Sequence, residues 1–263
     1  MKKVCYVFTL NVLLSGIAYG NSMQEVPIPK LIKDIKPSIV GVLARDINQS
    51  GTGVFLSINK KTYILTNEHV VALKDSAGET IKYSEDIVVT FNLKIKRAFF
   101  FQAEIEKTDE NSDLAALRFY RPVDMPDSLF DAVFVPSNIW KEPDDIKEGE
   151  TVIYSGYPTG WGLSYQRNYP LSRIGIVSQV IPGKKDFLID AFVQPGYSGS
   201  PVFLVRENQK DTLSKWMWYF IGIAKSYPKI YKNLTDSIKI SENPGFANVI
   251  GTGLIKKFFE VEK

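Results

Sequence analysis

Short segments rich in Val, Ile, Phe and Tyr recur along the chain, and Gly, Asn, Asp and Pro separate them. Such segments are typical of β-strands bounded by turns. The first six lie at 38–45, 53–58, 62–66, 86–92, 98–106 and 114–119. After a polar, proline-containing stretch at 120–148, six more lie at 151–156, 172–181, 186–191, 201–206, 216–224 and 245–250. The pattern predicts an all-β protein with a sandwich or barrel architecture.

Two segments have helical spacing instead. Residues 28–35 predict a short helix before the first strand. Residues 253–261 place apolar side chains three to four positions apart and predict a closing helix. The segment 216–224 is apolar throughout most of its length, but it is far too short to span a bilayer, so we interpret it as a buried strand.

Residues 1–20 predict a secretory signal peptide. Lys2 and Lys3 precede an apolar stretch that is shorter than the roughly 20 residues of a membrane span. Ala18 and Gly20 are the small residues that a signal peptidase requires, so we expect cleavage after Gly20. An uncleaved membrane anchor is the alternative. Cleavage removes Cys5, the single cysteine, and a disulfide-free exported chain of this size is ordinary in bacteria.

Composition excludes several classes of function. Hydrophobic residues make up 44% of the chain and charged residues 23%, which does not fit intrinsic disorder. One His and one Cys are too few for a zinc or haem site, and we expect no cofactor, although a calcium site of carboxylates and carbonyls stays open. The net charge is +3, and no run of Lys or Arg exceeds two residues, so we expect no nucleic-acid partner.

Three segments carry residues suited to nucleophilic chemistry. His69, the only histidine, follows the strand predicted at 62–66. Asp113 precedes the apolar strand 114–119, and Ser198 lies between Gly196 and Gly199. Each signal alone is weak, because a lone His, a turn Asp and a Gly-flanked Ser are common in ordinary loops. Together they provide a nucleophile, a base and a carboxylate that orients the base. A cleft between the two groups of strands could unite them.

The order and context of these residues resemble the trypsin/chymotrypsin-like serine protease family. T-N-E-H-V-V, D-L-A-A-L and G-Y-S-G-S-P are similar to its histidine, aspartate and serine motifs, and the resemblance covers roughly residues 36–258. It implies two six-stranded antiparallel β-barrels with the site in the cleft between them and a C-terminal helix. It further implies His69 as general base, Asp113 as orienting carboxylate and Ser198 as nucleophile. The N–H groups of Gly196 and Ser198 would form the oxyanion hole.

The resemblance also organises the chain. We expect a signal peptide at 1–20, an N-terminal segment with a short helix at 21–37 and a first barrel at 38–120. A linker at 121–148, a second barrel at 149–250 and a C-terminal helix at 251–263 follow. G-S-P-V-F and G-Y-P resemble glutamyl endopeptidases and exfoliative toxins, whereas D-A followed by P-G resembles HtrA/Deg proteases.

Several positions depart from the family pattern. The resemblance assigns Phe192, Lys225, Tyr227 and Gly245 to the substrate-binding pocket. Phe192 stands where trypsin has an aspartate, which argues against a preference for Lys or Arg. Lys225 could offer a positive charge or be a solvated surface residue, and Tyr227 stands where Gly is common, so its ring could narrow or close the pocket. Tyr197 replaces the aspartate that pairs with a new amino terminus in zymogen-activated members.

The sequence therefore predicts an exported, periplasmic or secreted serine endopeptidase that acts on protein or peptide substrates. We expect no stable membrane insertion once the signal is removed. A catalytically silent binding protein on the same fold is the main alternative. An esterase of the α/β-hydrolase type fits poorly, because that fold orders its triad Ser, Asp, His. Cleavage specificity and oligomeric state are left open.

Overall fold

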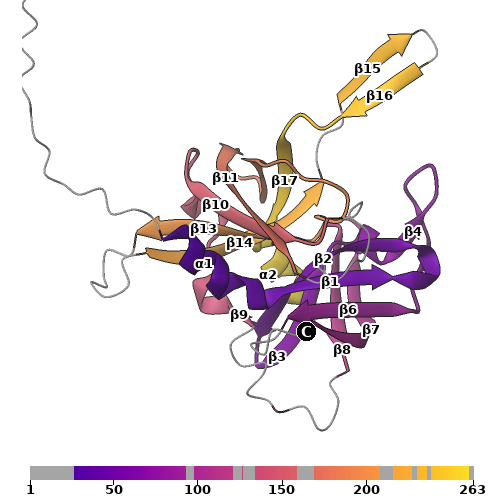
Figure 1. Ribbon diagram of the computed structural model, residues 1–263, viewed down its shortest axis with the longest axis horizontal. Helices are drawn as coiled ribbons and strands as arrows, with labels where there is room; N and C mark the ends of the chain where they lie inside the picture. The colour runs from indigo at the N-terminus through magenta and orange to yellow at the C-terminus, as the bar shows by residue number, and fades with distance from the viewer. Residues whose placement is uncertain are drawn as a thin grey trace, which may run out of the picture.

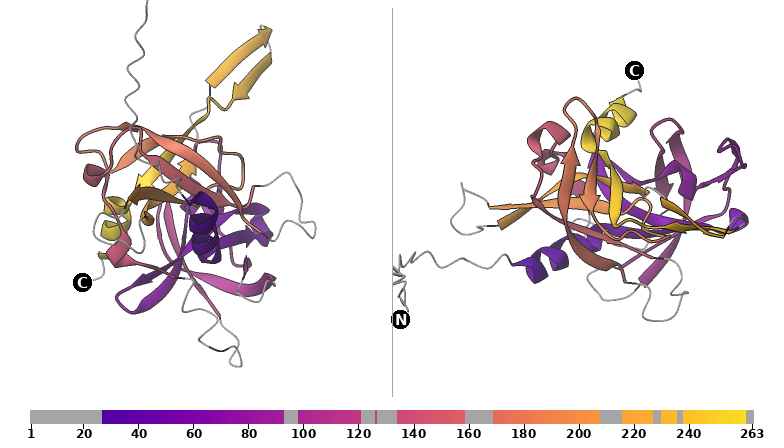
Figure 2. Two further views of the ribbon diagram at one scale, coloured as in Figure 1. Left: turned by 60° about the vertical axis from the view of Figure 1, so that its left-hand side comes forward. Right: turned by 90° about the horizontal axis from the view of Figure 1, so that it is seen from above.

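The protein is described by a computed structural model that covers residues 27–92, 98–120, 126, 134–158, 169–207, 216–226, 230–235 and 238–260. The expected signal peptide at 1–20 and the pocket residue Tyr227 lie outside these residues. Figure 1 and Figure 2 show two barrels side by side, with the N-terminal half of the chain in one and the C-terminal half in the other.

The first barrel is a closed ring of six antiparallel strands. Strand β1 pairs with both β2 and β6, and the ring continues β6-β7-β8-β3-β2. A short ninth strand adds to β2 in parallel, and a small hairpin of β4 and β5 stands beside the ring. The strands are β1 (Ile39–Ala44), β2 (Gln49–Ile58), β3 (Lys61–Thr66), β4 (Ala72–Lys74), β5 (Thr80–Tyr83), β6 (Ile87–Asn92), β7 (Ala98–Asp109), β8 (Leu114–Phe119) and β9 (Val135–Pro136).

The second barrel closes in the order β10-β11-β12-β17-β14-β13. Strands β15 and β16 form a separate hairpin, drawn away from the barrel in Figure 1. The strands are β10 (Thr151–Gly156), β11 (Leu171–Val180), β12 (Asp186–Asp190), β13 (Pro201–Glu207), β14 (Trp216–Ser226), β15 (Ile230–Thr235), β16 (Ile238–Glu242) and β17 (Phe246–Gly251). The expected all-β fold of two six-stranded antiparallel barrels is confirmed.

Two helices flank the barrels, as the apolar spacing predicted. Helix α1 (Ile28–Ile35) has one proline, Pro29, in its first turn, and α2 (Thr252–Glu260) closes the described chain. Short 3₁₀ turns occur at Lys36–Ser38, Arg45–Ile47, Glu68–Val70, Ser137–Ile139 and Pro143–Asp145. Neither helix is long and apolar enough to cross a membrane, and the described residues hold no other that is.

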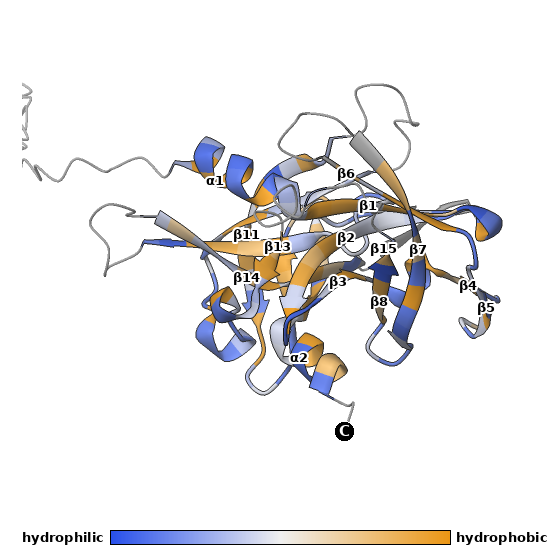
Figure 3. Cartoon of the chain, turned by 90° about the horizontal axis from the view of Figure 1, so that it is seen from below, coloured by the Kyte–Doolittle hydropathy of each residue, from blue (hydrophilic) through white to orange (hydrophobic). Residues whose placement is uncertain are grey.

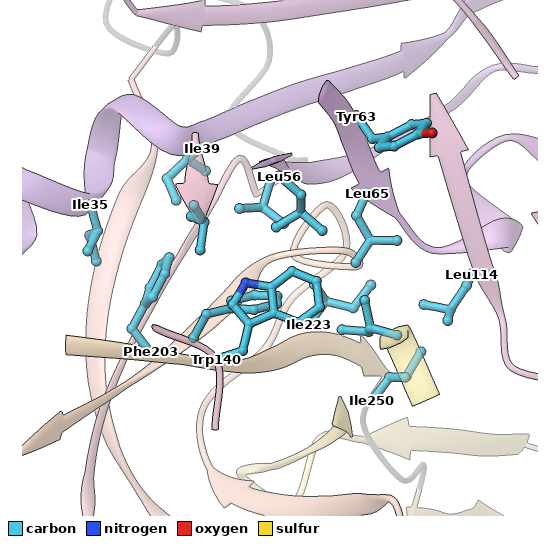
Figure 4. Close-up of a cluster of buried hydrophobic side chains, with 14 of the residues drawn as sticks. Ile35, Ile39, Leu56, Tyr63, Leu65, Leu114, Trp140, Phe203, Ile223 and Ile250 are labelled. Carbon is cyan, nitrogen blue, oxygen red and sulfur yellow. The ribbon is translucent and has the colours of Figure 1, made fainter. Parts of the chain in front are cut away.

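The buried side chains form three clusters, one inside each barrel and one between the barrels. The cluster between them takes Leu56, Leu65 and Leu114 from the first barrel and Phe203, Phe220 and Ile223 from the second. Leu31 and Ile35 of α1 and Ile255 and Phe258 of α2 join it. Figure 4 shows Leu56, Leu65 and Leu114 facing Phe203 and Ile223, with Trp140 among them. The two barrels thus share a continuous apolar core.

Strands at the junction of the barrels are buried on both faces. In β8, Leu114 and Ala116 face the shared cluster, while Ala115 and Leu117 face the interior of the first barrel. A strand that is covered on both sides reads as a continuous apolar run rather than as an alternation. Figure 3 shows the contrast, with β1 almost uniformly hydrophobic and β7 striped.

We expect the shared cluster to dominate the stability of the fold. Phe220 has no exposed surface and packs edge-on against Trp140, with ring centroids 5.3 Å apart. Phe220→Ala should lower the free energy of unfolding by about 3–5 kcal/mol, because it removes a large buried side chain and leaves a cavity. Urea unfolding followed by tryptophan fluorescence measures this change. Phe100→Ala is the control, since Phe100 is 60% exposed and should change stability by less than about 0.5 kcal/mol. Equal losses in the two variants would contradict the assignment.

Candidate active site

The His69 side chain is presented by a 3₁₀ turn that follows directly on β3. Strand β3 ends at Thr66 because the next residue, Asn67, turns its amide inward, where it donates to the backbone carbonyl of Asp113 at 3.0 Å. The backbone N–H of His69 donates to Asp113 Oδ1 at 3.0 Å. Two hydrogen bonds therefore join the histidine turn to the aspartate turn, in addition to the contact between the His69 and Asp113 side chains.

Asp113 occupies the turn between β7 and β8 with a backbone φ of +55°, a left-handed conformation that Asp tolerates better than most residues. Its carboxylate is almost fully buried, and Nδ1 of His69 lies 2.9 Å from Oδ1 and 3.0 Å from Oδ2. A carboxylate only accepts, so this contact places the imidazole proton on Nδ1. The lone pair of His69 Nε2 is then free to accept a proton.

A buried ion pair supports the same two turns. Glu68 has no exposed surface, and its carboxylate lies 2.8 Å from the Lys74 ammonium and accepts from Thr80 Oγ1 at 2.9 Å. The Lys74 ammonium and the Thr80 hydroxyl also lie 3.1 and 2.8 Å from Oε1 of Glu110. Burial acts to lower the pKa of Lys74, but the hydrogen bonds to Glu68 and Glu110 outweigh it and raise that pKa. The β4–β5 hairpin thereby joins the residue before His69 to the Asp113 turn.

Ser198 lies in the loop that joins β12 to β13. Gly196 and Gly199 on either side have φ of +93° and +82°, values that favour glycine. A Cβ at Gly199 would lie 1.9 Å from the Thr52 carbonyl oxygen, so the loop packs directly against β2. The hydroxyl of Ser198 donates to the backbone carbonyl of Lys225 at 3.2 Å. Within the described residues it makes no hydrogen bond to His69.

The histidine turn and the serine loop nevertheless meet at one residue of β2. A Cβ built on Gly51 would contact both Val70, which follows His69, and the Ser198 carbonyl oxygen, at 2.6 and 3.0 Å. Lys225 provides a second link, since its carbonyl accepts from Ser198 while its ammonium lies 3.8 Å from Asp113 Oδ2. The three residues expected to form a triad therefore belong to one site.

Thr52 joins the serine loop to the first barrel. This residue of β2 is completely buried, and its N–H donates to the Ser198 carbonyl at 2.8 Å. Its hydroxyl donates to the Gly196 carbonyl at 2.7 Å and accepts from the N–H of Tyr157 at 2.9 Å. Its carbonyl accepts from the hydroxyl of Thr66 at 2.7 Å. One residue thus fixes two carbonyl groups of the loop from across the barrel junction.

Between Gly196 and Ser200, two backbone N–H groups have no acceptor among the described residues. The N–H groups of Tyr197, Gly199 and Ser200 donate to Gln194, Ala224 and Tyr197 at 3.0, 2.8 and 2.9 Å. Those of Gly196 and Ser198 make no hydrogen bond within the described residues. Unpaired backbone donors near a surface are available to a ligand oxygen. The two N–H groups without an acceptor are the ones that the family resemblance assigns to an oxyanion hole.

The residues expected to line a substrate pocket have different surroundings. Phe192 is 46% exposed, and the guanidinium of Arg173 lies 5.8 Å from its ring centroid. Gly245 has a φ of +89°, and its carbonyl accepts from the N–H of Ala191 at 2.8 Å, so it lies beside the start of the serine loop. Lys225 directs its ammonium toward Asp113 and not into an isolated pocket. Tyr227 lies outside the described residues.

Sequence patterns did not indicate Thr52, the Glu68–Lys74 pair or Arg173 as parts of the site. The Gly-Thr-Gly run at 51–53 was a signal for Thr52, because two glycines in a strand mark a close approach of backbone. Glu68 and Lys74 look like surface charges in the sequence. The described residues hold no group of three or more His, Cys, Asp or Glu side chains able to bind a metal ion.

Comparisons with known proteins agree with this geometry. Residues 51–209, more than half of the chain, match the family described as trypsin-like peptidase domain. This chain therefore belongs to the trypsin-like peptidase family. A search of the curated proteins finds no match.

Solved structures of serine proteases share the fold. The crystal structure of the serine endoprotease from Yersinia pestis superposes with a TM-score of 0.57 and 24% identity, over 90% of this chain and 67% of that chain. The HtrA-type protease AlgW with tripeptide superposes with a TM-score of 0.55 and 20% identity, over 88% of this chain and 62% of that chain. The chain thus spans about two thirds of the length of these structures.

We expect Thr52→Val to damage both the fold and the site. Valine has nearly the same shape but leaves the Gly196 carbonyl and the Tyr157 N–H without their buried partner. At about 1–3 kcal/mol for each of the two groups, the free energy of unfolding should fall by about 2–6 kcal/mol in a urea titration. Thr90→Val is the matched control, because the buried Thr90 hydroxyl has no hydrogen-bond partner within the described residues. A Thr52→Val variant as stable as Thr90→Val would contradict the role of the Thr52 hydroxyl.

Proposed function

We propose that this chain is an exported serine endopeptidase that cleaves peptide bonds through His69, Asp113 and Ser198. The observation that carries the proposal is the His69–Asp113 pair, 2.9 Å apart, in one site with two unpaired N–H groups beside a serine hydroxyl. A serine hydroxyl needs a neighbouring base, and a tetrahedral intermediate needs donors for its oxyanion. Membership of a peptidase family supports a peptide as the substrate.

The reaction begins with a rotation of the Ser198 side chain from the Lys225 carbonyl toward His69 Nε2. The oxygen of Ser198 then attacks the scissile carbonyl carbon while Nε2 takes its proton, and the oxyanion accepts from the N–H groups of Gly196 and Ser198. His69 passes the proton to the leaving amine, which departs and leaves an acyl-enzyme. A water molecule, deprotonated by His69, attacks the ester carbon, and the Ser198 oxygen leaves and takes that proton back from His69 as the product acid is released. Asp113 keeps the proton on Nδ1 and stabilises the imidazolium.

A binding protein without catalytic activity is the second candidate. The observation that favours it is the hydroxyl of Ser198, which donates to Lys225 and not to His69. The two candidates differ in whether Ser198 becomes nucleophilic. A reagent that reacts only with an activated serine separates them.

We expect a fluorophosphonate to form a single adduct on the purified wild-type protein, read by intact mass. Ser198→Ala removes the nucleophile and His69→Ala removes its base, so neither variant should be labelled. Both should hydrolyse a denatured protein substrate about 10⁶-fold more slowly than wild type. Asp113→Asn should lose about 10⁴-fold, because the imidazole then adopts the wrong tautomer.

Ser172→Ala is the matched control for loss of a hydroxyl, since Ser172 lies on β11 and bonds to Ser155 at 2.7 Å, outside the site. It should be labelled like wild type. A folded wild-type protein that takes no adduct would favour the binding protein. An adduct on Ser198→Ala would assign the nucleophile to another residue.

Export is the remaining part of the proposal, and it rests on the amino-terminal sequence alone. Expression of the full chain in a bacterial host should give an exported form that begins at Asn21. Intact mass of the exported fraction measures the cleavage. A chain that keeps residues 1–20 and stays with the membranes would support the uncleaved anchor instead.

A further inference from the structure

The backbone around Tyr197 decides where the unpaired N–H of Ser198 points. The N–H of Ser198 shares a peptide plane with the Tyr197 carbonyl, and a trans peptide directs these two groups to opposite sides. The Tyr197 carbonyl accepts from Ser200, and the Tyr197 N–H donates to the Gln194 carbonyl. The orientation of the Ser198 donor therefore depends on where Tyr197 sits.

The side chain of Tyr197 is anchored inside the second barrel. It has no exposed surface, and its ring packs edge-on against Tyr154 of β10 at 5.8 Å between centroids. Its hydroxyl accepts a hydrogen bond from Nε of Arg173 at 3.3 Å. Burial raises the pKa of Tyr197, so the phenol is neutral when it meets the guanidinium. Arg173 faces Tyr154 across the β10–β11 pairing, so it belongs to the rigid wall of the barrel.

Arg173 contacts the serine loop at two points. Its guanidinium lies 5.8 Å from the ring centroid of Phe192, at the start of the loop, and 5.8 Å from that of Tyr197, directly before Ser198. Both are within the range of cation–π attraction. Arg173 forms no salt bridge with a carboxylate among the described residues. Its hydrogen bond to Tyr197 and its contacts with the two rings are directed to the loop, and it also interacts with the Tyr154 hydroxyl of β10.

We infer that Arg173 is a positioning residue that holds the oxyanion donor of Ser198 in place by fixing Tyr197 and Phe192 to the wall of the second barrel. The inference rests on the proposed peptidase function. In this inference Arg173 acts on the reacting atoms through the loop. A displacement of about 1 Å in catalytic geometry costs on the order of 10²-fold in rate.

The test replaces Arg173 by Met, which keeps an unbranched side chain but removes the charge and the donor. Arg173 borders a surface hollow of about 560 Å³, so the replacement has room. Arg173→Met should lower kcat about 10- to 100-fold on a peptide ester and leave KM within about 3-fold of wild type. It should weaken the binding of a peptide boronate, which mimics the tetrahedral intermediate, by a similar factor. The affinity for a product peptide should change little.

Tyr197→Phe removes only the hydroxyl and keeps the buried ring, so it tests the inference even where Arg173→Met folds poorly. It should lower kcat by a smaller factor with KM unchanged. When Tyr197→Phe is added to Arg173→Met, it should lower kcat by a smaller factor than it does in the wild-type protein, because the partner of the hydroxyl is already absent. Two strictly multiplicative losses in kcat would overturn the link between Arg173 and the Tyr197 hydroxyl.

Arg206→Met is the matched control. Arg206 lies on β13 and pairs with Glu150 at 2.6 Å, so its loss also removes a charged contact of the second barrel. It should lower the melting temperature but leave kcat and boronate affinity unchanged. Wild-type kcat in both Arg173→Met and Tyr197→Phe, or an equal loss of kcat in Arg206→Met, would overturn the inference. A wild-type protein that hydrolyses no ester would instead contradict the proposed function, and this is measured first.

Discussion

The hydrogen bonds of Thr52 across the barrel junction are the constraint on which the site depends. The loop that carries Ser198 approaches β2 so closely that Gly199 has no room for a side chain. Thr52 then bonds to the carbonyls of Gly196 and Ser198 at 2.7 and 2.8 Å. These contacts fix two carbonyl groups of the loop, while the N–H groups of Gly196 and Ser198 make no hydrogen bond among the described residues. A change in the relative position of the barrels would therefore shift the loop that carries these N–H groups.

The shared apolar cluster keeps that relative position fixed. Each barrel has its own interior core, and the third cluster joins strands of both barrels with α1 and α2. Strands β2, β3 and β8 are buried on both faces, and the turns that carry His69 and Asp113 extend directly from β3 and β8. Well-packed cores resist small displacements. Loop residues at the ends of such strands inherit their rigidity, which is what a site with three separate side chains requires.

The strands were predictable because their signals are local, and the three motifs on which the proposed triad rests are local as well. An apolar run such as 201–206 indicates a strand by itself, and β13 spans Pro201–Glu207. A single histidine left one choice of base. The contact of Thr52 with Gly196 joins residues 144 positions apart, and nothing local marks it. The β4–β5 hairpin was missed because its polar residues look solvent-exposed, although they enclose the buried carboxylate of Glu68. Arg173 was missed because its partners, an aromatic ring and a phenol, have no charge pattern.

The resting position of Ser198 is compatible with catalysis on energetic grounds. The bond from its hydroxyl to the Lys225 carbonyl is 3.2 Å long and joins two uncharged groups, and such a bond contributes only about 0.5–1.5 kcal/mol. Rotation to another staggered position breaks this bond alone. Rearrangement of the loop would break the bonds of Thr52 to both carbonyls and that of Ser200 to Tyr197. The loop backbone is thus held by several hydrogen bonds and the Ser198 hydroxyl by one. In the proposed mechanism, substrate binding turns this single side chain and leaves the N–H groups of Gly196 and Ser198 where they are.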